Sequence, residues 1–276
     1  MIRSLYIASS GMQSQQLNLD VISNNLSNVN TTGFKKSRAD FQSLLYQSLK
    51  EPTVSSENGN NSFGIEVGNG VRVVGTRTIL EQGVLHESES NQDLAIDGRG
   101  YFMVQLPDGN VGFTRNGAFR INSEGVLVNS NGCRVLSSQG NVTPENSISL
   151  NSKELKYIKP DTDTGTVNID KEGIISTEKE ISNSPVLELA DFINPGGLKA
   201  VGSTTYVASN VCGDVTIAQP TCDDFGTIEA GFLESSNVQI VEEMVKMIMA
   251  QRAYEIGSKA VQTSDEMMGM TNSLKR

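Results

Sequence analysis

Few side chains in this sequence could carry catalysis or hold a metal ion. The chain of 276 residues has one histidine, His86, and three cysteines, Cys133, Cys212 and Cys222, without C-x-x-C spacing. A lone histidine with no nucleophile signature cannot complete a catalytic triad, and this set lacks the spacing of zinc ligands. We therefore predict a protein that is not an enzyme, with no catalytic residue, no metal site and no cofactor.

Two motifs match ligand-binding loops only in part. "GRGYF" (98–102) has a G-x-G but neither the third glycine nor a following helix, so we predict a turn between strands. "DTDTGTVNIDKE" (161–172) places Asp161, Asp163 and Glu172 as in a calcium loop, but its glycine comes one position early. A hairpin is the better interpretation of that segment.

The cysteines leave two alternatives open. All three can be small buried thiols. Alternatively, Cys212 and Cys222 form a disulfide that closes a loop of about ten residues, which chain entropy makes worth ~2.5–3 kcal/mol in an oxidising compartment.

The first 30 residues predict an amphipathic helix. Apolar and small residues recur there at alternating spacings of three and four, as in an a/d seam sustained over about four heptads. The seam consists of Leu5, Ala8, Met12, Gln15, Leu19, Ile22, Leu26 and Val29. Ile7, Leu17 and Val21 lie outside it, so a single partner helix would leave apolar side chains in water.

The last 40 residues predict a second, longer helix with two apolar stripes. Ser235, Ser236 or Asn237 can cap its start, ahead of Glu242 and Glu243 in the first turns. One stripe contains Ile240, Met244, Met247, Tyr254, Val261 and Met268, and another, about 100° round the helix, contains Val241, Val245 and Ile248. The helix can be the core of an ordinary domain or one half of a terminal bundle, and its position opposite a matching helix favours the bundle.

Four asparagines crowd the end of the first helix, although asparagine is a poor helix former. Asn24, Asn25, Asn28 and Asn30 lie off the a/d seam, where their amides could bond to other helices and fix one register. The alternative, strongest for Asn30, is simple helix termination, with Gly33 free to adopt a positive φ.

The middle of the chain changes from helical to β periodicity. Residues 101–136 alternate short β-type runs with "PDGN", "RNG", "SEG" and "SNG", which are turn sequences of successive hairpins. Residues 50–70 are rich in Gly, Ser and Asn and predict a long loop or extended arm. We predict an α+β fold: a discontinuous helical domain (1–36 and 235–276), an extended connecting arm (37–75) and an inserted, mainly antiparallel β domain (76–234).

Charge is concentrated in that middle part. Of the net charge of −10, residues 1–36 carry +2 (three basic residues against Asp20) and residues 235–276 carry zero (five against five), which leaves −12 for 37–234. Nearly neutral ends can pack against copies of themselves, and the absence of a basic stripe argues against nucleic acid. No window is apolar enough to cross a membrane, and residues 1–13 lack the apolar region of a cleaved signal peptide.

Three segments, in order, resemble one family, the bacterial flagellar rod and hook proteins. "SNNLSNVNTTGFKK" resembles its N-terminal signature, residues 93–136 its central β module, and residues 231–268 its C-terminal helix. Chain length and the extra segment at about 46–66 resemble the distal-rod branch most closely. The hook and proximal-rod branches are alternatives, and a secreted β-domain binding module is an alternative from another class.

The resemblance implies a structural subunit that the flagellar type III apparatus exports without a cleaved signal. It implies a periplasmic helical tube of many copies that joins the motor to the hook, with proximal-rod and hook-side proteins and the surrounding basal-body rings as partners. The terminal helices would form the inner wall and become ordered on association, and the β domain would face outward. The predicted subunit interface contains Leu5, Met12, Leu19, Ile22, Asn24, Asn25, Leu26, Asn28, Val29, Gly33, Phe34, Ile240, Val241, Met244, Val245, Met247, Ile248, Arg252, Tyr254 and Val261.

Overall fold

The chain divides into two units in a computed structural model. The model describes residues 2–50, 64–144, 148–150, 153–160, 168–176, 184–202, 204–222 and 225–274. One unit, here the helical unit, contains residues 1–27, 37–78 and 239–276, and the other, the β unit, contains residues 28–36 and 79–238. Asp161, Asp163 and most of the segment 46–66 lie outside the described residues. The predicted functional division into inner core, arm and outer domain stays a prediction.

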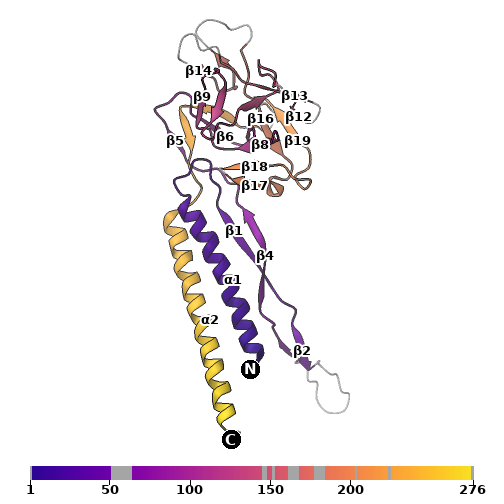
Figure 1. Ribbon diagram of the computed structural model, residues 1–276, viewed down its shortest axis with the longest axis vertical. Coiled ribbons are helices and arrows are strands. Elements are labelled where there is room, and N and C mark those ends of the chain that lie inside the picture. The colour runs from indigo at the N-terminus through magenta and orange to yellow at the C-terminus, as the bar shows by residue number, and fades with distance from the viewer. Residues whose placement is uncertain are drawn as a thin grey trace. The chain divides into compact units, whose positions relative to one another are not determined.

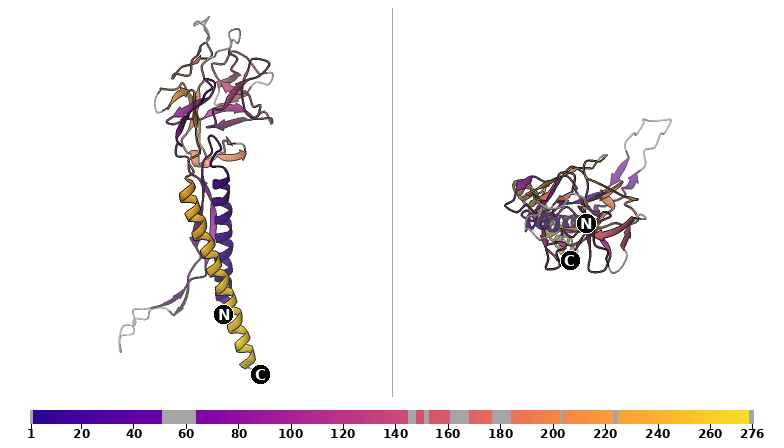
Figure 2. Two further views of the ribbon diagram at one scale, coloured as in Figure 1. Left: turned by 90° about the vertical axis from the view of Figure 1, so that its left-hand side faces the viewer. Right: turned by 90° about the horizontal axis from the view of Figure 1, so that it is seen from above.

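Two long helices form the core of the helical unit. Helix α1 (Ile2–Ser27) and helix α2 (Ile240–Leu274) lie side by side, with the N-terminus and C-terminus at the same end (Figures 1 and 2). Their antiparallel register is fixed by Ser4, whose hydroxyl lies 3.3 Å from that of Ser264, and by Gly257, which lies against Met12. The predicted pair of terminal helices is confirmed.

Local sequence explains where these helices begin and end. Glu242 and Glu243 lie in the first turn of α2, where carboxylates favour the positive end of the helix dipole. Helix α1 ends at Ser27, before the turns of residues 28–33. Gly33 has the expected positive φ of +68°, but it lies six positions beyond the last helical residue, so the prediction that it terminates the helix is wrong.

A two-stranded ribbon completes the helical unit. Strand β1 (Ser37–Ser43) pairs antiparallel with β4 (Val71–Thr78), with a bulge between Asp40 and Phe41. Farther along, β2 (Gln47–Lys50) pairs with β3 (Ile65–Val67). The described ends of the predicted arm are therefore strands, not loop.

The β unit is built around a seven-stranded antiparallel sheet. The sheet has the order β12 (Ile148–Leu150), β13 (Lys153–Tyr157), β11 (Val135–Ser137), β7 (Phe102–Gln105), β8 (Val111–Thr114), β18 (Thr205–Val207), β17 (Lys199–Gly202). The antiparallel pairs outside it are β9 (Phe119–Ile121) with β10 (Leu127–Asn129), β14 (Asn168–Ile169) with β15 (Ile175–Ser176), β16 (Leu189–Phe192) with β19 (Val215–Ala218), β6 (Leu94–Asp97) with β20 (Thr227–Ala230), and β5 (Leu85–Glu87) with β21 (Phe232–Glu234). A short 3₁₀ helix, η1, spans Pro195–Gly197.

Strand β7 separates two hydrophobic cores. Phe102 and Val104 point into one core, and Met103 points into the other, because successive side chains of a strand face opposite sides of its sheet. Two of the predicted hairpin turns of residues 101–136 join paired strands, "PDGN" between β7 and β8 and "SEG" between β9 and β10. The prediction is wrong for "RNG", because β8 pairs with β18 and not with β9, and "SNG" is spanned by a single bridge between Val128 and Arg134. The α+β fold class is confirmed.

Candidate interaction surface

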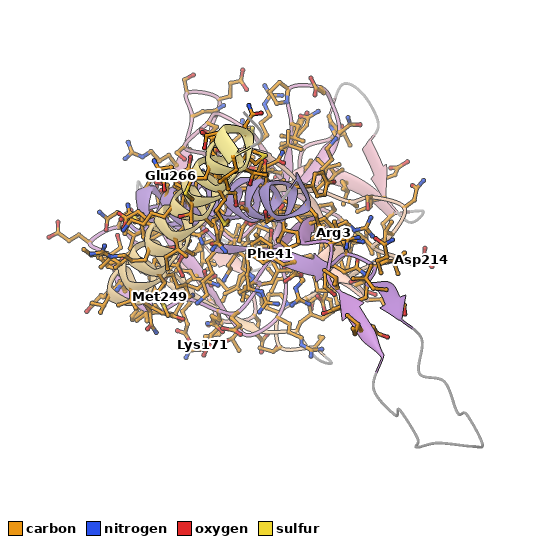
Figure 3. All side chains as sticks on the ribbon, turned by 90° about the horizontal axis from the view of Figure 1, so that it is seen from below. Arg3, Phe41, Lys171, Asp214, Met249 and Glu266 are labelled. Carbon is orange, nitrogen blue, oxygen red and sulfur yellow. The ribbon has the colours of Figure 1, made fainter. Side chains whose placement is uncertain are left out.

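One face of α2 is apolar and uncovered in the single chain. Val241 is 75% exposed and Ile256 68% exposed, and the side chains between them on the same face, Val245, Ile248 and Met249, are also exposed. Met249 is labelled on α2 in Figure 3. Contiguous exposed apolar side chains mark a surface that binds another molecule. Among the described residues, no helix is long and apolar enough to span a bilayer.

The predicted interface residues fall into an inner and an outer group. The inner group is buried or half-buried within the helical unit and contains Leu5, Met12, Leu19, Ile22, Leu26, Met247 and Val261. The outer group is exposed on α2 and contains Ile240, Val241, Met244, Val245, Ile248, Arg252 and Tyr254. The structure therefore gives the two stripes of the C-terminal helix different surroundings. Part of the first lies along α1, whereas the second, Val241, Val245 and Ile248, faces solvent.

An apolar groove runs between the two helices. It has a volume of about 430 Å³ and is lined on α1 by Ser4, Ile7, Ala8, Gly11, Met12 and Gln15 and on α2 by Ala253, Ile256, Gly257 and Ala260. A Cβ at Gly257 would lie 2.7 Å from the Met12 side chain, so glycine is what permits the close approach of the helices. Ile7, outside the predicted seam, lines this groove.

Asn25 ties α1 to α2 and to β1. Its amide nitrogen donates to the Ser37 carbonyl (2.8 Å) and to Glu243 Oε2 (3.1 Å), and its amide oxygen accepts from the Ser37 backbone N–H (2.9 Å). The side chains of Asn25 and Glu243 are both buried. An asparagine amide of the motif thus bonds to another helix, as expected. Its partner, Glu243, belongs to the same chain.

Lys246 neutralises the buried carboxylate of Glu243. Its ammonium lies 2.8 Å from Glu243 Oε1 and 3.0 Å from Glu242 Oε1. Partial burial disfavours the charged form of Lys246, but the hydrogen bonds to Glu243 and Glu242 outweigh burial and raise the pKa of the lysine. Two donors, Asn25 and Lys246, therefore satisfy the buried carboxylate of Glu243.

The other residues of the asparagine motif lie in varied surroundings. Asn24 and Asn30 are exposed, Asn28 accepts a hydrogen bond from the Thr31 hydroxyl (3.2 Å), and Val29 and Phe34 are half-buried. Gly33 is buried, and a Cβ there would lie 2.6 Å from the backbone nitrogen of Asn116.

A buried ionic cluster in the β unit has no counterpart in the sequence predictions. Lys35 Nζ lies 2.5 Å from Glu234 Oε1 and donates to the Glu81 carbonyl (2.6 Å), and Arg115 Nη1 lies 3.5 Å from Glu234 Oε2. Burial lowers the pKa of Lys35, and the facing Glu234 carboxylate opposes this change. No local pattern predicts this cluster, because the partners of Lys35 come from distant parts of the chain.

The few candidate chemical groups do not converge on a site. His86 is exposed on β5, and Gly98 and Gly100, with φ +116° and +127°, form the predicted turn between β6 and β7. Cys133, Cys212 and Cys222 are free thiols, so the structure does not have the Cys212–Cys222 disulfide. Only Cys212 is buried, so the alternative of three buried thiols is wrong for the half-buried Cys133 and the exposed Cys222. Within the described part of the chain, no group of three or more His, Cys, Asp or Glu side chains is placed to hold a metal.

Comparison with known proteins decides the family. Residues 5–35 match the model of flagella basal body rod proteins, residues 95–177 the D1 domain of flagellar hook protein FlgE/F/G, and residues 229–274 the C-terminal part of flagellar basal body rod FlgEFG proteins. The flagellar basal-body rod protein FlgG of Borreliella burgdorferi is 43% identical, with all of both chains covered. The chain belongs to the flagellar basal-body rod family.

The FlgG proteins of two further bacteria align with this chain over their full length. Identity is 37% with the protein of Caulobacter vibrioides (99% of this chain, all of the relative) and 35% with that of Bacillus subtilis (all of both chains). The predictions of a structural, non-enzymatic, distal rod subunit in the periplasmic flagellar basal body are confirmed. Membership of the basal-body rod family implies assembly with other axial flagellar proteins.

Proposed function

We propose that this rod subunit polymerises through its helical unit into a rigid helical tube, the shaft that transmits torque from motor to hook. The observation that carries the proposal is the exposed apolar face of α2 from Val241 to Ile256. Covering an apolar side chain of this size is worth roughly 1.5–3 kcal/mol, and neighbouring copies can supply that cover. A head-to-tail contact that does not close into a ring generates a filament.

The finer partners follow from this role. One end of the tube would join the proximal rod proteins and the other the hook-side proteins, and the acidic β unit would face the surrounding basal-body rings. The flagellar type III apparatus would deliver the chain. Each of these partners is a proposal supported by family membership.

The test compares a charged face with a charged control. Val245→Glu together with Ile248→Glu places two carboxylates on the exposed face, and Gln251→Glu places one elsewhere on the exposed surface of α2. By electron microscopy we expect straight tubes from the unchanged protein and from Gln251→Glu. The doubly charged variant should keep its helical circular dichroism but form no tubes. Tubes from the doubly charged variant would refute the proposal.

Hydrogen exchange tests whether association stabilises the two helices. We expect amides of α1 and α2 to exchange faster in dilute monomer than in tubes, because burial of apolar faces by neighbours stabilises helices that are marginal alone. Equally slow exchange in the monomer would show that the helical unit needs no neighbour.

A further inference from the structure

Helix α2 extends beyond the start of α1. Ser264 is level with Ser4, so residues 267–274 of α2 have no residue of α1 beside them. Figures 1 and 2 show the C-terminal end projecting past the N-terminal end. This overhang carries Met267, Met270 and Leu274 at spacings of three and four, which places them on one face. Met270 is 58% exposed, and the other two are exposed as well.

The overhang matches the groove side chain by side chain. The groove residues on α2 are Ala253, Ile256 and Ala260, which have the same spacings of three and four. A shift of 14 positions (270 − 256) brings Met270 level with Ile256, and it brings Met267 and Leu274 level with the two alanines. Met267 and Leu274 then face alanines, Met270 packs against Ile256, and glycines at 11 and 257 widen the groove.

Two oppositely charged side chains are also brought together by the same register. A shift of 14 positions also brings Glu266, at the start of the overhang, level with Arg252 (266 − 252). Glu266 and Arg252 are both exposed, and Arg252 is bound on its own helix only to the exposed carboxylate of Glu255 (3.0 Å). Glu266 lies on α2 in the view of Figure 3. Opposite charges therefore meet beside the apolar contact.

We propose that the overhang of one copy docks in the α1–α2 groove of a second copy, displaced along the helix axis by about 21 Å, at ~1.5 Å for each of 14 residues. This inference rests on the proposed self-assembly and names the two surfaces that meet. The occupant is a second copy because the overhang and the groove of one chain lie at different levels of the same helix and cannot meet. Each copy offers one overhang and one groove, and because every contact adds the same displacement along the axis, the contact repeats without closing into a ring.

Disulfide trapping tests the register. In a Cys222→Ser background, which removes the exposed thiol, Met270→Cys subunits are mixed with Ile256→Cys subunits and assembled under mild oxidation. We expect linked dimers in the assembled mixture and none from either variant alone. The matched control replaces Ile256→Cys by Gln262→Cys, an exposed residue of α2 outside the groove, and should give no linked dimer.

The outcomes separate this inference from the proposed function. Tubes without the Met270–Ile256 link, or with an equal link to position 262, would overturn the docking register and leave self-assembly intact. Protein that forms no tubes at all would overturn both.

Charge reversal gives an independent measurement. Glu266→Arg or Arg252→Glu alone should raise the concentration needed for assembly, because like charges meet at the contact. The two changes together should restore it toward the original value, since each copy then presents the reversed pair. If the double variant assembles no better than the single ones, Glu266 and Arg252 do not meet.

Discussion

Asn25 on α1 donates a hydrogen bond to Glu243 on α2 across 218 positions of sequence, at 3.1 Å and out of contact with water. The same amide is bonded to both backbone groups of Ser37 at the start of β1. One side chain of α1 thus joins that helix to α2 and to β1 within the helical unit.

Replacing Asn25 by alanine should destabilise the helical unit. The change leaves the Ser37 backbone groups and one oxygen of Glu243 without their partner, and an unsatisfied buried polar group costs about 1–3 kcal/mol. We expect the free energy of unfolding to fall by about 2 kcal/mol. Urea unfolding, followed by circular dichroism at 222 nm, measures this change. Asn30→Ala, at an exposed position of the same motif, should change the free energy of unfolding by less than about 0.5 kcal/mol.

Glu234→Gln should lower the free energy of unfolding by more than Lys35→Met does. Without the Glu234 carboxylate, Lys35 and Arg115 are two buried cations that face a neutral amide, whereas loss of Lys35 leaves Glu234 paired with Arg115. Removing one partner of a buried ion pair costs about 3–5 kcal/mol.

The exposed pair of Lys171 and Glu229 provides the control for this cluster. Lys171→Met should lower the free energy of unfolding least of the three, because water screens an exposed pair. The three variants are ranked by urea unfolding of the β unit. A ranking with Lys35→Met as the most destabilising would contradict the assignment of Glu234 as the shared counter-ion.

Gly33→Ala should be far more damaging than Gly109→Ala. Both glycines have positive φ, +68° and +79°, which costs a residue with a Cβ roughly 1–2 kcal/mol. At Gly33 the new Cβ would also lie 2.6 Å from the nitrogen of Asn116, whereas no atom lies within 4 Å at Gly109. In thermal unfolding, we expect Gly33→Ala to lower the free energy of unfolding by at least about 2 kcal/mol more than Gly109→Ala does. Equal effects would show that the backbone near Asn116 can move away.

Alkaline pH should destabilise the β unit through two tyrosines. Burial raises the pKa of Tyr101 and of Tyr206 to about 12, against about 10 in an unfolded chain. Between these values the folded state keeps the proton and the unfolded state loses it. The contribution of these two tyrosines to stability is therefore constant below pH 10 and falls as pH rises toward 12. The loss approaches about 2–3 kcal/mol for each tyrosine.

Absorbance at 295 nm measures this titration directly. Tyr101→Phe and Tyr206→Phe should each remove part of the ionisation step near pH 12, while Tyr46→Phe, at an exposed position, should leave that step unchanged. A native curve with no ionisation delayed beyond pH 10 would contradict the burial of both phenols.

The two helices, the hairpins at "PDGN" and "SEG" and the acidic middle were determined by the sequence itself. Heptad spacing predicts which face of a helix is apolar, and turn residues such as those of "PDGN" predict a hairpin. Both features depend only on residues a few positions apart in the sequence. The same local rules showed that α2 has two apolar stripes, but not which of them meets α1.

Tertiary structure alone decided which partners meet. The register of α1 on α2, the pairing of Lys35 with Glu234 across 199 positions, and the exposure of Val241, Val245 and Ile248 depend on where distant segments lie once both units have folded. A lysine in "TTGFKK" reads as a surface charge until Glu234 is placed beside it. Its burial is favourable only because the fold supplies a carboxylate and a backbone carbonyl in place of water.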